Sequence, residues 1–233
     1  MIKAVIFDLD GTLHDREQSL HIFISRQYSR FKDLFSCVDE ELYKTRFIQL
    51  DNGGYVWKDK VYRQLAEELG MESISADELL KDYILNFSSC CRAFHGTARM
   101  LRDLTNARYK LAIMTNGRSD FQMRTILSLS LEQYFQCILI SEMEGIGKPG
   151  IDIFARAASK LGADPSQCVY VGDHPINDIE GAKRAGMAAV WKYNRFWSEL
   201  ERVDGVLREM TELPFIIRNL DEQLTKMRAA KAE

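Results

Sequence analysis

The feature that most constrains the fold of this chain is a run of apolar residues at positions 2–7 that ends abruptly in acidic residues. The run IKAVIF is too short for a helix and nearly continuous in apolar character, which is typical of a β-strand buried on both faces. Asp8 and Asp10 follow it, and Gly11 with Thr12 predicts a tight turn. Because alternate side chains of an extended backbone point to the same side, we expect the two carboxylates to lie together at the end of a buried strand.

Two neighbouring carboxylates in such a position repel each other and resist the loss of water. They are tolerated if a cation lies between them or if one of them keeps its proton. The alternatives are a solvated turn without chemistry and a fragment of a calcium-binding loop. A calcium loop fits poorly, because Leu9, Thr12 and Leu13 stand where such a loop needs further oxygen ligands.

From residue 96 onward the sequence alternates between helical and strand patterns. The predicted strands cover 109–114, 136–140, 167–171 and 188–191, and the predicted helices cover 97–106, 119–129, 151–161 and a segment that ends at Gly186. Helices between successive strands indicate right-handed crossovers and a parallel sheet. We therefore expect an α/β fold with a doubly wound parallel sheet, and residues 215–217 are a candidate for its last strand.

Residues 15–92 have a helical pattern throughout and are inserted after the first strand. Apolar residues recur at helical spacing along this segment, and Asp39 is predicted to cap one of its helices. We therefore expect two domains, a core formed by 1–14 with 93–233 and an all-helical domain formed by 15–92. Within the latter, the stretch 51–55 contains two adjacent glycines. It is either a plain interhelical loop or, together with Trp57 and Lys58, a loop that contacts the substrate.

Polar residues stand at the ends of three predicted strands: Asp8 with Asp10, Thr115 with Asn116, and Asp173. Ligands of an open parallel sheet bind at the carboxyl ends of its strands, so we expect these residues to share one site.

The motif DLDGTL after a hydrophobic strand resembles the first motif of the haloacid dehalogenase-like (HAD) superfamily. Thr115, Lys148 and the pair Asp173 and Asp178 match the second, third and fourth motifs of that superfamily in order and approximate spacing. The third motif departs slightly from the usual lysine-proline-aspartate-proline, because Gly150 replaces an acidic residue. The resemblance covers about residues 2–191 and implies a Rossmann-like core.

The resemblance implies phosphoryl transfer through an aspartyl-phosphate. Asp8 is then the nucleophile, and Asp10, which the dehalogenases of the family lack, protonates the leaving oxygen and later helps to activate water. The cofactor implied is Mg²⁺, held by Asp8, the backbone carbonyl of Asp10 and Asp173. Asp178 is expected beside them, where it orients a ligand or Lys148. The donors expected to bind the phosphoryl oxygens are the Thr115 hydroxyl, the amides of Asn116 and Gly117, and the Lys148 ammonium.

The resemblance also implies that residues 15–92 form a helical cap of the C1 type. TNG at 115–117, Gln122 shortly after it and ISE before the lysine loop look most like the branch with pyrimidine 5′-nucleotidases and sugar-phosphate phosphatases. The expected substrate is therefore a small phosphorylated metabolite, either a nucleoside monophosphate or a sugar phosphate. The alternatives are a phosphomutase of the β-phosphoglucomutase kind and a non-catalytic binding protein on the same fold.

The composition argues against several other classes of protein. The net charge is −3 and there is no long basic run, so nucleic acid is not an expected partner. No apolar run approaches the roughly 20 residues of a membrane span and no signal-peptide pattern is present, so we expect a cytoplasmic monomer or homodimer without a membrane partner. The five cysteines form no CxxC pair, which makes a zinc site a poor fit. His14, His21 and His95 have no partner spacing and are expected to have surface or packing roles.

Overall fold

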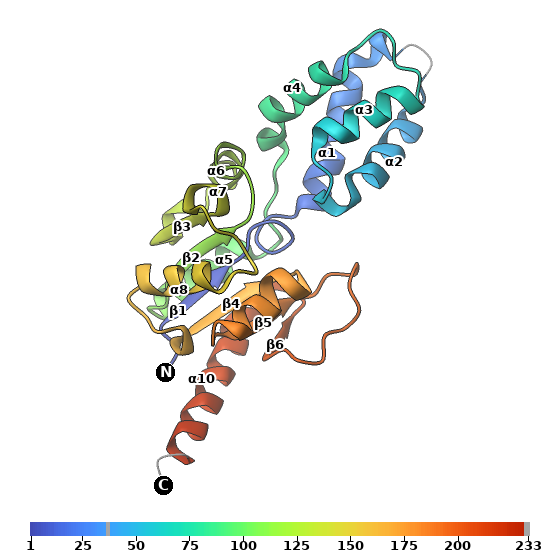
Figure 1. Ribbon diagram of the computed structural model, residues 1–233. Helices are drawn as coiled ribbons and strands as arrows, with labels where there is room; N and C mark the ends of the chain where they lie inside the picture. The colour runs from blue at the N-terminus through green and yellow to red at the C-terminus, as the bar shows by residue number, and fades with distance from the viewer. Residues whose placement is uncertain (36–37, 231–233) are drawn as a thin grey trace. The chain divides into compact units, whose positions relative to one another are not determined.

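The chain forms two compact units in the computed structural model, which describes residues 1–35 and 38–230 (Figure 1). Unit 1 comprises Met1–Asp15 and the chain from Ala93 on, and unit 2 comprises Arg16–Arg92. Unit 2 is thus inserted in the sequence after the first strand and the turn that follows it. Within the two described ranges, no helix has the length and apolar character needed to cross a bilayer.

Unit 1 is built on a parallel sheet of six strands. They are β1 Ala4–Phe7, β2 Lys110–Thr115, β3 Cys137–Ile140, β4 Cys168–Gly172, β5 Ala188–Lys192 and β6 Gly205–Leu207. Their order across the sheet is β3-β2-β1-β4-β5-β6, with every neighbouring pair parallel. All of β1 is buried between β2 and β4, as its continuous apolar run predicts. The predicted doubly wound α/β fold is confirmed.

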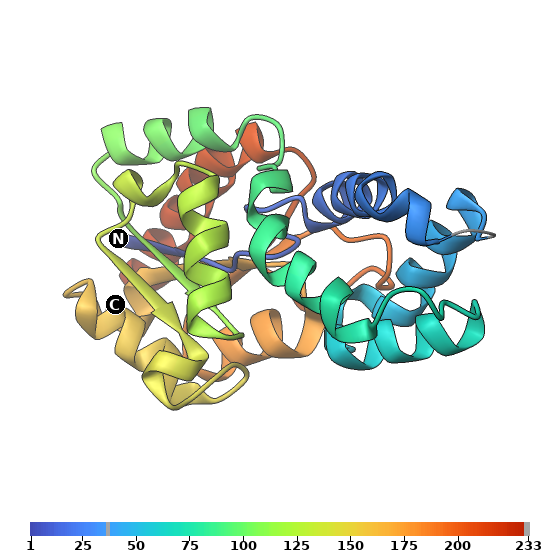
Figure 2. The same ribbon diagram turned by 90° about the horizontal axis from the view of Figure 1, so that it is seen from above.

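Helices cover both faces of this sheet (Figure 2). They are α5 Thr97–Asn106, α6 Ser119–Ser128, α7 Ser141–Glu144, α8 Ile151–Lys160, α9 Gly181–Arg184 and α10 Leu213–Ala230, with a π-helix at Pro175–Glu180 leading into α9. Val5 and Phe7 pack in an apolar cluster with residues of α5, α6 and α10, whereas Ala4 and Ile6 pack in a second cluster with residues of α8 and α9. The alternation of side chains along β1 therefore produces a core of three layers.

The prediction of a last strand at 215–217 is wrong, and the sixth strand is β6. Residues 215–217 lie near the start of α10, where a proline in the first turn is compatible with a helix. The buried residues of this segment are Leu213, Ile217 and Leu220, which share one helix face, and Phe215 is exposed. Burial in the folded protein therefore follows helical spacing, although the composition of the segment is typical of a strand.

The described part of unit 2 contains the helices α1 Arg16–Phe31, α2 Glu40–Asp51, α3 Lys58–Glu68 and α4 Ala76–Asn86. The Asp39 side chain caps α2 by accepting from the Leu42 amide, as predicted. A buried glutamine, Gln27, accepts from the hydroxyls of Tyr43 and Tyr62 at 2.9 and 2.8 Å. The interior of unit 2 is thus partly polar, and its hydrogen bonds fix how the helices pack.

A buried ion cluster connects three helices of unit 2. Asp51, the last residue of α2, accepts two hydrogen bonds from the Arg16 guanidinium at 2.9 and 3.0 Å and one from the Lys58 ammonium. Arg16 begins α1 and Lys58 begins α3. Gly54 leaves room for this arrangement, since a Cβ there would lie 2.9 Å from Cζ of Arg16. Asn52–Gly54 form a short 3-10 helix between α2 and α3, and the Lys58 ammonium is engaged within unit 2.

The two chain segments that flank the insertion are paired inside unit 1. His14 forms an antiparallel bridge with Ala93, and the Phe94 amide donates to the Leu13 carbonyl at 3.1 Å. The chain consequently leaves and re-enters unit 1 at adjacent points.

Candidate active site

Asp8 is the first residue after β1 and lies at the carboxyl edge of the central strand. Its amide donates to the Val171 carbonyl at 2.9 Å, which keeps the chain beyond β1 beside β4. Its carboxylate is buried, with Oδ1 accepting from Lys148 Nζ at 2.5 Å and Oδ2 from the Thr12 hydroxyl at 3.3 Å. The adjacent ammonium lowers the pKa of this carboxyl group and so opposes the effect of its burial.

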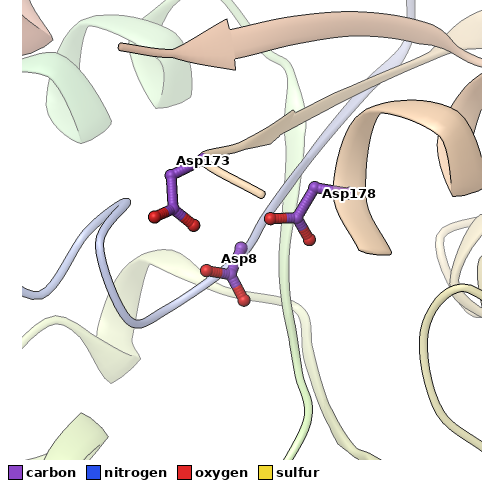
Figure 3. Close-up of side chains that lie close together, drawn as sticks. All are labelled: Asp8, Asp173 and Asp178. Atoms are coloured by element: carbon purple, nitrogen blue, oxygen red, sulfur yellow. The ribbon is translucent and has the colours of Figure 1, made fainter. Parts of the chain in front are cut away.

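Three carboxylates from two distant parts of the sequence meet at this edge (Figure 3). One oxygen from each of Asp8, Asp173 and Asp178 lies within 4.8 Å of the other two. Asp173 directly follows β4, and Asp178 lies in the π-helix. Glycines permit this close approach, because a Cβ on Gly172 would lie 2.5 Å from Cβ of Asp178, and a Cβ on Gly11 would lie 2.8 Å from Cγ of Asp173.

Burial and the charges of neighbouring carboxylates raise the pKa of Asp8 and of Asp173. Burial raises the pKa of Asp8 well above its ordinary value, an effect that Lys148 opposes and Asp178 reinforces. Burial, and after it the charge of Asp178, raises the pKa of Asp173 to about 7. Burial by itself lowers the pKa of Lys148, but Asp178 and Asp8 outweigh it and raise the pKa overall, so the ammonium stays charged.

The cluster fits a hard divalent cation in charge and in ligand chemistry. Three ionised carboxylates against the single Lys148 ammonium leave an excess of two negative charges. The ligand atoms that the cluster offers are carboxylate oxygens, which are the atoms that Mg²⁺ prefers. A divalent ion at this place removes the excess charge and favours the ionised form of each acid.

Asp10 makes its contacts with a different set of residues. Its carboxyl group is 33% exposed, with Oδ1 lying 2.6 Å from Nδ1 of His14 and Oδ2 accepting from Nε2 of Gln122 at 2.9 Å. His14 is fully buried. The expected packing role of His14 is therefore incomplete, because the side chain also pairs with Asp10. A histidine four residues after an acid in the same turn was the available signal.

The residues after β2 have two kinds of contact. The Thr115 hydroxyl oxygen is buried and accepts from Gln122 Nε2 at 2.8 Å. The Asn116 side chain forms two hydrogen bonds with the backbone of Lys148. It donates to the Lys148 carbonyl and accepts from the Lys148 amide, both at 2.9 Å. The Gly117 amide, predicted as a phosphate donor, here donates to the Ser141 hydroxyl at 3.0 Å.

Lys148 is fixed by three hydrogen bonds of its ammonium. Nζ donates to Asp8 at 2.5 Å, to Asp178 at 2.6 Å and to the Tyr170 hydroxyl at 2.9 Å. The Tyr170 hydroxyl in turn donates to Asp178 Oδ1 at 3.0 Å, and the second Asp178 oxygen accepts from the His174 amide at 2.9 Å. Because an ammonium has three hydrogens, all of them are used and the charge is held in one place.

A family model described as haloacid dehalogenase-like hydrolase matches residues 5–192. The chain belongs to this family. The match starts in β1 and ends with β5, so it includes all four motifs on which the resemblance depends, and that resemblance is confirmed.

Named members of the HAD-like family are similar to this chain over most of its length. The glyceraldehyde 3-phosphate phosphatase of Pyrococcus furiosus is 28% identical over 229 residues, which are 95% of this chain and 94% of that protein. The pyrimidine 5′-nucleotidase YjjG of Escherichia coli is 27% identical over 195 residues, or 80% and 84% of the two chains. The crystal structure of a HAD phosphatase from Thermococcus onnurineus superposes with a TM-score of 0.66 at 26% identity and covers 93% of this chain and 98% of that one.

Two residues beyond the four HAD motifs also hold Asp173. Asn194 Nδ2 donates to Asp173 Oδ2 at 2.7 Å, and the Trp191 indole donates to the Asp173 carbonyl at 2.8 Å. Sequence reasoning missed both, although Asn194 is a polar residue shortly after a predicted strand and that was a usable signal. His174, the residue after Asp173, accepts from the amides of Ile176 and Asn177 at 3.1 Å and so caps the π-helix.

Proposed function

We propose that this HAD-like hydrolase is a Mg²⁺-dependent phosphatase that hydrolyses a small phosphorylated metabolite through an aspartyl-phosphate on Asp8. The observation that carries the proposal is Asp10. Its carboxyl group stands two residues after a buried, lysine-paired carboxylate, is one-third exposed and has a hydrogen-bonding partner at each oxygen. A second acid at this place serves phosphoryl transfer, which needs a proton donor, and the dehalogenases of the family lack it.

In the proposed reaction, an Asp8 oxygen attacks phosphorus and the bond from phosphorus to the leaving oxygen breaks. Asp10 gives its proton to that oxygen. In the second step Asp10 takes a proton from water, the water oxygen bonds to phosphorus, and the bond from phosphorus to Asp8 breaks, which restores the carboxylate. The first step needs protonated Asp10 and the second needs ionised Asp10, so the orientation of its carboxyl group affects both steps.

Lys148, whose hydrogens are used by Asp8, Asp178 and Tyr170, supplies positive charge near the phosphoryl group. Thr115 and the backbone after β2 supply donors for the phosphoryl oxygens. Asp8, Asp173 and the Asp10 carbonyl would hold Mg²⁺, which neutralises charge between the nucleophile and the substrate. Both oxygens of Asp178 accept from protein donors, which supports a role in orienting Lys148 alongside the metal cluster. Loss of any one of these donors is expected to lower turnover on the order of 100-fold.

The proposed substrates are sugar phosphates and nucleoside monophosphates. Relatives named for glyceraldehyde 3-phosphate and for pyrimidine nucleotides support this class. Residues 15–92 are proposed as the helical cap that chooses among them.

The test is hydrolysis of p-nitrophenyl phosphate by the purified protein with and without Mg²⁺, followed by a screen of sugar phosphates and nucleotides. We expect activity that needs Mg²⁺ and disappears in Asp8→Asn, and ³²P label from substrate that is found on acid-quenched wild-type protein. Hydrolysis that persists in Asp8→Asn, or a folded wild type without activity on any phosphate ester, would overturn the proposal.

A further inference from the structure

Gln122, in the second turn of α6, is the residue that joins two parts of the site. It is 3% exposed, and its Nε2 lies 2.9 Å from Asp10 Oδ2, 2.8 Å from Thr115 Oγ1 and 3.2 Å from the Asn116 carbonyl. A carbonyl and an ionised carboxylate can only accept, so the nitrogen of the amide must face them. The NH₂ group of Gln122 therefore donates hydrogen bonds both to the turn after β1 and to the end of β2.

For Thr115, this contact decides what the hydroxyl can do. Its oxygen accepts from Gln122, which leaves the hydroxyl hydrogen to donate elsewhere. In the contacts described it donates to the Asn116 carbonyl at 3.4 Å, which is long for an O–H···O bond. The hydroxyl is thus prepared to donate to an incoming phosphoryl oxygen.

For Asp10, the contact fixes the plane and the rotation of the carboxyl group. Oδ2 accepts from Gln122 and Oδ1 faces His14, so the group cannot turn without losing one of the two. Gly117 leaves room for the Gln122 side chain, since a Cβ there would lie 3.0 Å from Cγ of Gln122. The amide itself is restrained by its contacts with Asp10, the Thr115 hydroxyl and the Asn116 carbonyl.

We propose that Gln122 is a positioning residue that holds the Asp10 carboxyl group and the Thr115 hydroxyl at fixed positions relative to each other. Proton transfer from Asp10 to the leaving oxygen and binding of the phosphoryl group by Thr115 then both depend on the buried amide of Gln122. This inference rests on the proposed phosphatase function. Gln122 touches neither the nucleophile nor the metal cluster in the contacts described, so its effect passes through Asp10 and Thr115.

The experiment compares Gln122→Met and Gln122→Glu with wild type on p-nitrophenyl phosphate and phenyl phosphate. Methionine keeps the length of the side chain and removes the donor, whereas glutamate keeps the shape and puts an acceptor beside Asp10. Phenolate is the poorer leaving group and needs the proton of Asp10 more. We therefore expect the ratio of kcat/KM for p-nitrophenyl over phenyl phosphate to rise on the order of tenfold in both variants.

A role in packing alone would lower kcat/KM for both esters by the same factor. Thr125→Val serves as the matched control, because Thr125 is buried on the same helix and its hydroxyl donates to the Phe121 carbonyl at 3.1 Å, away from Asp10 and Thr115 in the contacts described. It is expected to leave the ratio at the wild-type value. An unchanged ratio in soluble, cooperatively unfolding Gln122→Met or Gln122→Glu overturns this inference, whereas an inactive wild type overturns the phosphatase proposal instead.

Discussion

Replacing Gly172 by alanine tests how tightly the carboxylate cluster is packed. A Cβ at this position would lie 2.5 Å from Cβ of Asp178 and 2.6 Å from its Oδ2, whereas ordinary contact begins at 3.4 Å. Asp178 must therefore move by about 1 Å, and its bonds to Lys148 at 2.6 Å and to Tyr170 at 3.0 Å cannot both survive. Because Lys148 also bonds to Asp8, a misplacement of about 1 Å is expected to lower kcat about 100-fold.

The assay is steady-state hydrolysis of p-nitrophenyl phosphate at saturating Mg²⁺, with thermal unfolding measured on the same preparations. Gly205→Ala is the matched control, because its Cβ would lie 2.8 Å from a methyl group of Ile216 at the edge strand β6. Both variants are expected to lose about 1–3 kcal/mol of stability through overpacking. If Gly172→Ala folds and keeps the wild-type kcat, the described contact between Gly172 and Asp178 does not control the site.

The other predictions concern the metal, the ion cluster of unit 2 and the lysine loop. Mg²⁺ is expected to raise Tm of the wild type and to do so much less in Asp173→Asn, since a ligand that binds only the folded state stabilises it; differential scanning fluorimetry over a Mg²⁺ titration measures this. Burial raises the pKa of Asp51, but its two cationic partners lower it further, to below the ordinary value of about 3.9. Its contribution to stability is therefore present above about pH 4 and is lost as the pH falls through the lowered pKa. Urea unfolding at several pH values should show that Asp51→Asn loses about 3–5 kcal/mol near neutral pH and a smaller part of that in acid. Asn116→Ala removes two hydrogen bonds to the Lys148 backbone and is expected to lower kcat on the order of tenfold, measured with p-nitrophenyl phosphate.

The sequence predicted those elements whose burial is continuous or strictly periodic. β1 is an apolar run buried along its whole length, and α5 has the predicted bounds, with one apolar face. β6 was missed because it is a three-residue edge strand in which Leu207 alone is fully buried. The segment before α9 was predicted as an ordinary helix and begins as a π-helix at Pro175–Glu180.

The candidate site could be predicted to the extent that its residues stand at strand ends in recognisable motifs. Asp8 and Asp173 converge because parallel strands end at one edge. Asp178 was expected beside them only from the resemblance to the fourth motif, since it lies in the π-helix after β4. The partners of Asp10 could not be found in this way. Gln122 reaches Asp10 from 112 positions away, and the choice of that amide among many polar side chains depends on how α6 packs beside the turn after β1.

Residues 13–14 pair through their backbone with residues 93–94, so the two ends of the inserted segment are joined by hydrogen bonds within unit 1. The residues that form the six strands of unit 1 and both of these pairings all lie outside residues 16–92. Inserts of other lengths and sequences can be accommodated at the same place, because the hydrogen bonds that close it belong to the scaffold. Evolution can therefore exchange the inserted segment while the carboxylates at the strand ends stay where they are.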